Sequence, residues 1–190
     1  MRTRILFLRI DHAKEFLAAT ITLREKLASR YFLLNGLAPM ELANARIEHL
    51  DPVECTLFLP KRHWKRNCVA HIDADTVKLQ IMYSGDRVEG PLIRTWGEKP
   101  PHRTTMNVII KRIALRTTIP RKDAISPLVL KRTFGRLWIK STGNVCTLQK
   151  QFSHKHLWST AHYLRFVMED VSPDHSRMME QLEASMKLMV

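Results

Sequence analysis

The stretch from Ile125 to Lys140, ISPLVLKRTFGRLWIK, contains the clearest helix signal in the chain. Ser126 is a preferred N-cap residue, and Pro127 fits the first helical position, where its missing N–H costs no hydrogen bond. Apolar side chains then recur at the spacing of one helix face, at Leu130, Phe134, Leu137 and Trp138. We therefore predict a helix that begins after Ser126 and packs this face into a core.

The residues upstream predict a helical unit at the start of the chain. Asp11 is expected to cap a first helix, and the apolar run 27–34 predicts a buried second helix that ends near Asn35–Gly36. Pro39 suits the first turn of a third helix, which is expected to run through Ile47.

A β-hairpin is expected next. Two short runs with high β-propensity, residues 56–60 and 67–71, flank the basic stretch KRHWKR. The tip of this hairpin would carry the cations Lys61, Arg62, Lys65 and Arg66. Such a tip is suited to contact nucleic-acid phosphates.

Two further helices are expected after the hairpin. Asp73 is a suitable N-cap for the first, and Gly85 suits its end. After a proline-rich loop, Thr104 or Thr105 is expected to cap the second. That helix directs several cations toward solvent or a ligand, namely Lys111, Arg112 and Arg116.

These elements predict a mostly helical α+β fold with a small antiparallel β-hairpin or sheet. The chain has 190 residues, which suits one domain with a sizeable core, so we expect a single domain over residues 1–190. Ser172 and Pro173 repeat the cap pair of Ser126 and Pro127, and predict a terminal helix over residues 172–190 with methionines along one side.

The charge balance favours a polyanionic partner. Lys and Arg number 31 against 18 Asp and Glu, a formal net charge of +13, so DNA or RNA is the expected partner. Cys55, Cys68 and Cys146 form no CxxC pair, which favours a reducing cytoplasm. No run predicts a membrane span and no spacing fits a zinc site, so we expect a cytoplasmic, nucleoid-associated protein without metal or cofactor.

Four blocks in order resemble the catalytic domain of the tyrosine recombinases, the phage integrase family. The Ile125–Lys140 helix and the following NVCTLQKQFSHKHLWSTAHYLRF resemble its HxxR helix and its GH box with the tyrosine segment. His154 precedes Thr160 by six residues and Tyr163 by nine, as in the family's GH…T…Y pattern. Upstream, LLNGLAPMELANARIEHLD resembles the TGLR block, and LFLPKRHWKRNCV the hairpin with the catalytic lysine. The N-terminal core-binding domain of most members is not expected in this chain.

The resemblance implies a reaction on duplex DNA. In the family a tyrosine attacks a phosphodiester and forms a 3′-phosphotyrosine, two arginines clamp the nonbridging oxygens, and the hairpin lysine is the general acid. By position, the nucleophile falls on Tyr163 and the later histidine on His154. The lysine falls on Lys61, with Lys65 as the alternative.

The phosphate clamp departs from the family pattern. Its first arginine falls on Ala38, the HxxR histidine on Leu128 and the HxxR arginine on Lys131. Lysine supplies charge but not the planar fork of arginine. Arg132 is either a substitute cation in the pocket or a contact to the DNA backbone. We therefore expect a DNA-binding protein that is impaired or inactive in strand cleavage.

The expected DNA contacts are cations of the hairpin and of two helices: Lys61, Arg62, Lys65, Arg66, Lys111, Arg112, Arg116, Arg132 and Arg136. Two other functions stay open. An active recombinase would cleave DNA through Tyr163, and an interaction protein would use residues 172–190 to form a homo-oligomer or bind a partner recombinase. Purely structural roles also stay open, for Lys61 as a solvated cation, for His154 at a helix end and for Tyr163 as a packed aromatic.

Overall fold

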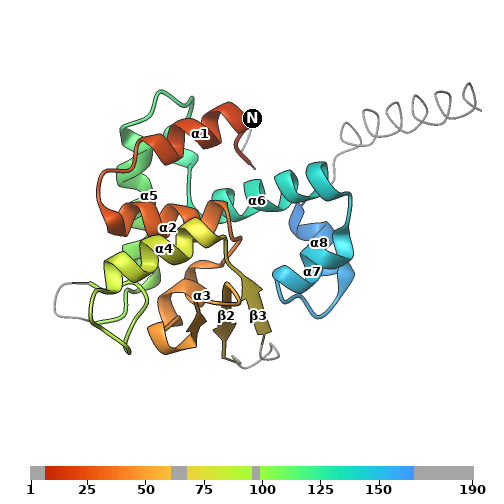
Figure 1. The fold of residues 1–190 in the computed structure, drawn as a ribbon. Coiled ribbons are helices and arrows are strands. Elements are labelled where there is room, and N and C mark those ends of the chain that lie inside the picture. Colours follow the sequence, from red (N-terminus) through yellow and green to blue (C-terminus); the bar gives the residue numbers. More distant parts are fainter. Residues whose placement is uncertain (1–6, 61–67, 96–98, 165–190) are drawn as a thin grey trace, which may run out of the picture.

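The computed structural model describes residues 7–60, 68–95 and 99–164. α6 (Pro127–Thr142) is the longest of the described helices, and it connects the main body of the molecule with a smaller group formed by α7 and α8 (Figure 1). The other elements, in chain order, are α1 (Ile10–Ala18), α2 (Leu23–Leu33), α3 (Pro39–Asn44), the 3₁₀ turn η1 (Ile47–His49), β1 (Leu50–Asp51), β2 (Thr56–Leu59), β3 (Cys68–His71), α4 (Ala74–Ser84), α5 (Arg103–Leu115), the 3₁₀ turn η2 (Lys122–Ala124), α7 (Val145–Gln151) and α8 (Leu157–Leu164). The predicted fold class, mostly helical with a small antiparallel sheet, is confirmed.

Local chemistry at the helix ends explains the boundaries that were predicted correctly. The hydroxyl of Ser126 accepts a hydrogen bond from the Val129 amide at 3.4 Å at the start of α6. The carboxylate of Asp73 accepts from the Thr76 amide at 3.0 Å at the start of α4, and Gly85 ends that helix with a φ of +56°.

Two predicted caps are wrong. The N-cap of α1 is Arg9, and Asp11 lies in the first turn, where its carboxylate pairs with the Arg9 guanidinium at 2.8 Å. The N-cap of α5 is His102 and neither Thr104 nor Thr105, because an imidazole nitrogen of His102 accepts from the Thr104 amide at 3.4 Å. In both cases the observed N-cap residue lies two or three positions before the expected one.

The third helix is shorter than predicted. α3 ends at Asn44, and Ile47 begins a separate 3₁₀ turn. The backbone beyond the helix bonds to a distant loop instead, since the Ala45 carbonyl accepts from the Leu92 amide at 2.9 Å and the Ile47 amide donates to the Gly90 carbonyl at 2.9 Å. A long-range pairing therefore outweighs one further helical turn.

The predicted hairpin is present and belongs to a three-stranded antiparallel sheet in the order β1-β2-β3. Leu57 lies opposite Ala70, and both are buried, whereas the neighbouring pair of Phe58 and Val69 is exposed. This alternation places one face of the sheet against the core. The short strand β1 was not predicted.

The buried apolar residues form two clusters. The larger one combines α1, α2, α4, α5, the strands and the first turn of α6, with Phe16, Tyr31 and Phe32 among its largest members. The smaller one contains Phe134 and Phe152 and joins the second half of α6 to α7 and α8. The pair of α7 and α8 therefore has a core of its own.

Gly36 lies where these two clusters meet. Its φ is +68°, and a Cβ at this position would lie 2.4 Å from Cδ1 of Phe134 and 2.8 Å from Cε1 of Phe152. Only glycine fits a backbone of this conformation at so close an approach.

Within the described residues, no helix has the length and apolar character to cross a membrane.

Candidate functional site

α6 presents the site positions that follow Ser126. Leu128 is 40% exposed, whereas Lys131 is only 3% exposed. Arg132 and Arg136 are half-buried. The expected position of the HxxR histidine is thus an exposed leucine. The expected position of its arginine, one helical turn later, is a buried lysine.

Lys131 is held by a carboxylate from another part of the chain. Its Nζ lies 3.4 Å from Oε2 of Glu41 on α3, and the side chains are 4% and 15% exposed. The same Glu41 oxygen accepts a hydrogen bond from the Ala38 amide at 2.6 Å. The two positions expected for the clamp arginines, Ala38 and Lys131, are therefore joined through one carboxylate.

An aromatic ring also lies beside the ammonium group. Nζ of Lys131 lies 4.5 Å from the ring centre of Phe152, within the range of a cation–π contact. Carboxylate and ring together balance the charge of Lys131 inside the protein. The ammonium group is therefore buried and paired within the protein.

Glu41 was not predicted as a site residue from the sequence. It lies three residues after Ala38 in the first turn of α3, a spacing at which glutamate commonly bonds back to the N-cap amide. That spacing was a local signal for the bond to Ala38. The pairing with Lys131, 90 residues away, has no local signal.

His154 is fixed by contacts on several sides. Its Nδ1 lies 2.9 Å from Oγ1 of the fully buried Thr160, and its ring packs edge-on against Phe152 with 5.3 Å between ring centres. The Gln149 side chain donates to the His154 carbonyl at 2.9 Å. The bond between His154 and Thr160 joins two residues of the predicted GH…T…Y pattern across the turn between α7 and α8.

Ser153 adopts a conformation that favours glycine. Its φ is +55°, and it stands directly before His154, where the family pattern has glycine. Ser153 therefore takes a left-handed backbone conformation at the position where the family pattern has glycine.

Several predicted site residues lie partly or wholly outside the described structure. Tyr163 lies in the last turn of α8, and nothing is described of its side chain. The hairpin cations and the terminal segment lie outside the described residues, namely Lys61, Arg62, Lys65, Arg66 and residues 172–190. The structure brings the described positions Ala38, Lys131 and His154 together around Phe152 and Glu41.

The cations predicted on α5 differ in their surroundings. Lys111 is exposed, and its Nζ donates to the carbonyl of Asp123. Arg116 pairs with the buried Glu25 at 2.6 Å. Burial works to raise the pKa of Glu25, but hydrogen bonds from backbone amides and from Arg116 outweigh it and lower that pKa. Arg112 is exposed on the same helix.

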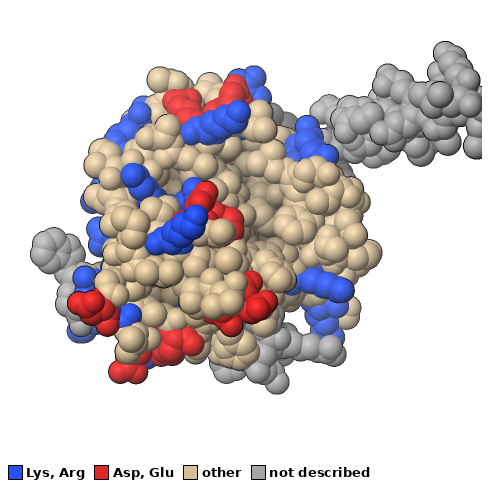
Figure 2. Space-filling view, viewed as in Figure 1, with Lys and Arg blue, Asp and Glu red and all other residues tan. Residues whose placement is uncertain are grey.

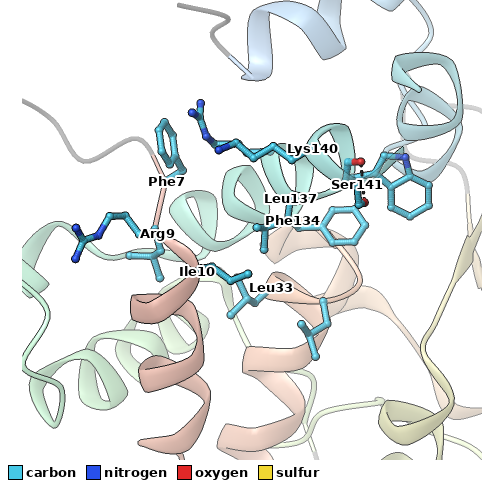
Figure 3. A pocket seen from close by; sticks show the side chains of 12 residues that line it. Phe7, Arg9, Ile10, Leu33, Phe134, Leu137, Lys140 and Ser141 are labelled. Carbon is cyan, nitrogen blue, oxygen red and sulfur yellow. Dashed lines mark hydrogen bonds between the residues drawn. The ribbon is translucent and has the colours of Figure 1, made fainter. Parts of the chain in front are cut away.

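A cavity of about 950 Å³ opens where α1, α2 and α6 meet (Figure 3). Leu33, Phe134 and Leu137 lie along its apolar floor. Arg136 and Lys140 lie on the α6 side, with the Arg136 guanidinium 3.9 Å from the ring centre of Phe7. Apolar and cationic groups thus border one groove.

The surface shown in Figure 2 carries basic and acidic side chains side by side. This face is therefore not a uniformly basic surface, in spite of the net charge of +13.

Comparison with known proteins relates this arrangement to a family. No protein-family model matches the sequence. The tyrosine recombinase XerA of Saccharolobus solfataricus is 25% identical over 158 residues, which cover 82% of this chain and 50% of that protein. The crystal structure of XerA recombinase matches with a TM-score of 0.79 at 18% identity, over 90% of this chain and 62% of that one. The chain is a tyrosine recombinase catalytic-domain-like protein.

Other solved tyrosine recombinases have the same fold as this recombinase-like chain. The Tn1549 transposon integrase, in complex with transposon right end DNA, matches with a TM-score of 0.74 at 12% identity, over 94% of this chain and 67% of that one. A lambda integrase dimer bound to a COC′ core site matches with a TM-score of 0.68 at 15% identity, over 86% of this chain and 49% of that one. The recombinase-like chain spans about half the length of the curated relative that it matches.

Proposed function

We propose that this chain is a DNA-binding protein whose recombinase-like site is impaired or inactive in strand cleavage. The observation that carries the proposal is the buried pair of Lys131 and Glu41 at the position of a clamp arginine. A cation that is enclosed and already paired stabilises little of the charge that develops on a phosphate in the transition state.

The expected loss of rate is large. Removing one preorganised donor to a developing charge costs on the order of 10²- to 10³-fold in rate. Here Ala38 offers no donor in its side chain, and Lys131 offers no planar fork. The two losses together reach roughly the square of that factor if they act independently, and less if they act as a unit.

DNA binding requires fewer specific side chains than cleavage does, because phosphate contacts require only accessible cations. The net charge of +13 and the exposed Arg112 on α5 support it. Solved relatives in complex with DNA, the Tn1549 integrase and the lambda integrase dimer, support the same class of partner. We place the proposed activity in the cytoplasm, on the nucleoid.

Titration of duplex DNA at several salt concentrations tests the binding proposal. We expect the logarithm of the association constant to fall linearly with the logarithm of salt concentration, by about 0.9 for each phosphate contact. Sequence preference should be modest, because most contacts are to the backbone. Absence of affinity for duplex DNA, or affinity without salt dependence, would refute the proposal.

We propose further that the terminal segment 172–190 docks into the groove between α2 and α6 of a second copy. The methionines and leucines of this segment suit the apolar floor formed by Leu33 and Phe134. The mass in solution of the full chain and of a chain that ends at residue 171 tests this. A dimer or larger assembly that becomes a monomer is expected; equal masses would refute it.

A further inference from the structure

The side chain of Gln151, the last residue of α7, bonds to two other segments of the protein. Its Oε1 accepts from the His71 amide at 3.1 Å, and its Nε2 donates to the His71 carbonyl at 2.9 Å. Nε2 also donates to the Asn35 carbonyl at 3.0 Å. Only 8% of Gln151 is exposed, so these bonds form away from solvent.

The bonds to His71 replace a missing strand. β3 pairs with β2 along one edge, and it is the last strand in the order β1-β2-β3. Its other edge would leave an unpaired amide and carbonyl. The Gln151 amide satisfies both groups of His71, and it thereby attaches α7 to the sheet.

The three segments joined by these bonds contain Asn35, His71 and Gln151, and each lies close in the sequence to an expected site position. Asn35 lies three residues before Ala38, and Gln151 lies three residues before His154. His71 belongs to the strand that pairs with Thr56–Leu59 in the hairpin. The side-chain amide of Gln151, in the segment that carries His154, is therefore hydrogen-bonded to two other segments. One of them leads to Ala38, and the other is a strand of the hairpin.

Apolar packing and polar bonds both contribute to this junction. Phe134 and Phe152 hold α7 and α8 on α6 in a cluster that is separate from the main core. Polar bonds to β3 and to the end of α2 fix the position of that unit against the main body, and three such bonds come from Gln151.

We propose that Gln151 is a positioning residue that holds the sheet, the link from α2 to α3, and α7 with α8 in the arrangement that contacts DNA. The proposal rests on the proposed DNA-binding function. Without these bonds, the segments must be ordered when DNA binds, and this ordering lowers affinity.

Gln151→Leu removes the three bonds and keeps a side chain of similar size. The matched control is Gln80→Leu in α4, because Gln80 is 1% exposed and also makes three hydrogen bonds, to Tyr31, Ser84 and the Leu92 carbonyl. Both changes are expected to lower the thermal midpoint, since each removes buried hydrogen bonds. Only Gln151→Leu is expected to change DNA binding.

The measurement is the affinity of the folded full-length variants for one duplex over a range of salt concentrations. For Gln151→Leu we expect about two- to tenfold weaker binding and a smaller salt slope, with Gln80→Leu equal to the unmodified chain. Hydrogen exchange should show faster exchange in β3 of Gln151→Leu. Equal DNA affinity of Gln151→Leu and the unmodified chain, or equal weakening in both variants, would overturn the positioning role alone. An unmodified chain that binds no duplex would refute the proposed function, and the positioning role with it.

Discussion

Lys131 is enclosed by other groups of the protein at the position expected for a clamp arginine. Its ammonium group lies between the Glu41 carboxylate and the Phe152 ring, and only 4% of the side chain is exposed. Burying two charged groups costs desolvation free energy, and the attraction between the two groups must offset it. In the proposed function, the contacts that enclose Lys131 also weaken its electrostatic interaction with a phosphate.

Removing one member of this pair should be costly. Lys131→Met removes the ammonium group from the largely buried Glu41 carboxylate, and we expect the free energy of unfolding to fall by about 3 kcal/mol. Urea unfolding measures this. The double variant Lys131→Met with Glu41→Gln should recover most of the loss, because the amide oxygen still accepts from Ala38. A single variant within about 0.5 kcal/mol of the unmodified chain would contradict the buried pair.

Gly36 should tolerate no larger side chain. Gly36→Ala places a methyl group 2.4 Å from Phe134 in a backbone of positive φ, and we expect roughly 2–4 kcal/mol of destabilisation. Gly143→Ala at the end of α6 is the control, since its φ is +65° but nothing lies within 4 Å, and about 1 kcal/mol is expected. Urea unfolding of both variants measures the difference, and equal losses would show that the contact with Phe134 contributes nothing.

At the scale of elements, α2 and α4 are joined by a polar cluster at Asp73. Burial works to raise the pKa of this carboxyl, but hydrogen bonds from Thr76, Arg30 and Asn35 outweigh it and lower the pKa. A group with a lowered folded-state pKa adds stability above its unfolded pKa, and this stability is lost as pH falls through the folded pKa.

We therefore expect a pH-dependent effect of Asp73→Asn. The free energy of unfolding of the variant should be lower than that of the unmodified chain at pH 7, and the difference should shrink as the pH is lowered below about 4. Urea unfolding across this range measures the effect. Asp86→Asn is the control, because Asp86 is exposed and no ion pair is described for it, and its curve should follow that of the unmodified chain. A difference for Asp73→Asn that does not change with pH would contradict this account.

The elements that were predicted correctly have boundaries set by neighbouring residues. Ser126 and Asp73 cap their helices through bonds that reach three residues along the chain. The end of α3 and the strand β1 depend on partners elsewhere in the fold, and the sequence pattern does not contain that information. The candidate site divides in the same way. The positions of Ala38 and Lys131 follow from motif spacing, whereas their connection through Glu41 exists only in the folded chain.

At the scale of the whole molecule, some cations form ion pairs with residues of the fold, and others are exposed without a described ion pair. Arg116, the C-cap residue of α5, is exposed but forms an ion pair with the buried Glu25, whereas Arg112 within α5 is exposed and no ion pair is described for it. Net charge alone therefore overstates the number of cations that DNA can reach.

The two arginines should respond differently to substitution. Arg112→Ala should weaken binding to all duplexes alike and reduce the salt slope by about 1. Arg116→Ala should mainly lower the free energy of unfolding, since it leaves Glu25 buried without its cation. Parallel DNA titrations and urea unfolding separate the two effects. The assignment of Arg112 to the DNA surface fails if its variant binds DNA with unchanged salt slope.

The trapping of a covalent protein–DNA adduct tests the central claim most directly. The full chain is incubated with a pool of nicked duplexes of randomised sequence, and adducts are separated under denaturing conditions, with an active tyrosine recombinase and its own nicked site as the positive control. We predict that the chain binds the pool but gives no adduct above the level of the Tyr163→Phe variant. An adduct that forms readily and disappears in Tyr163→Phe would contradict the claim that the replaced clamp disables cleavage.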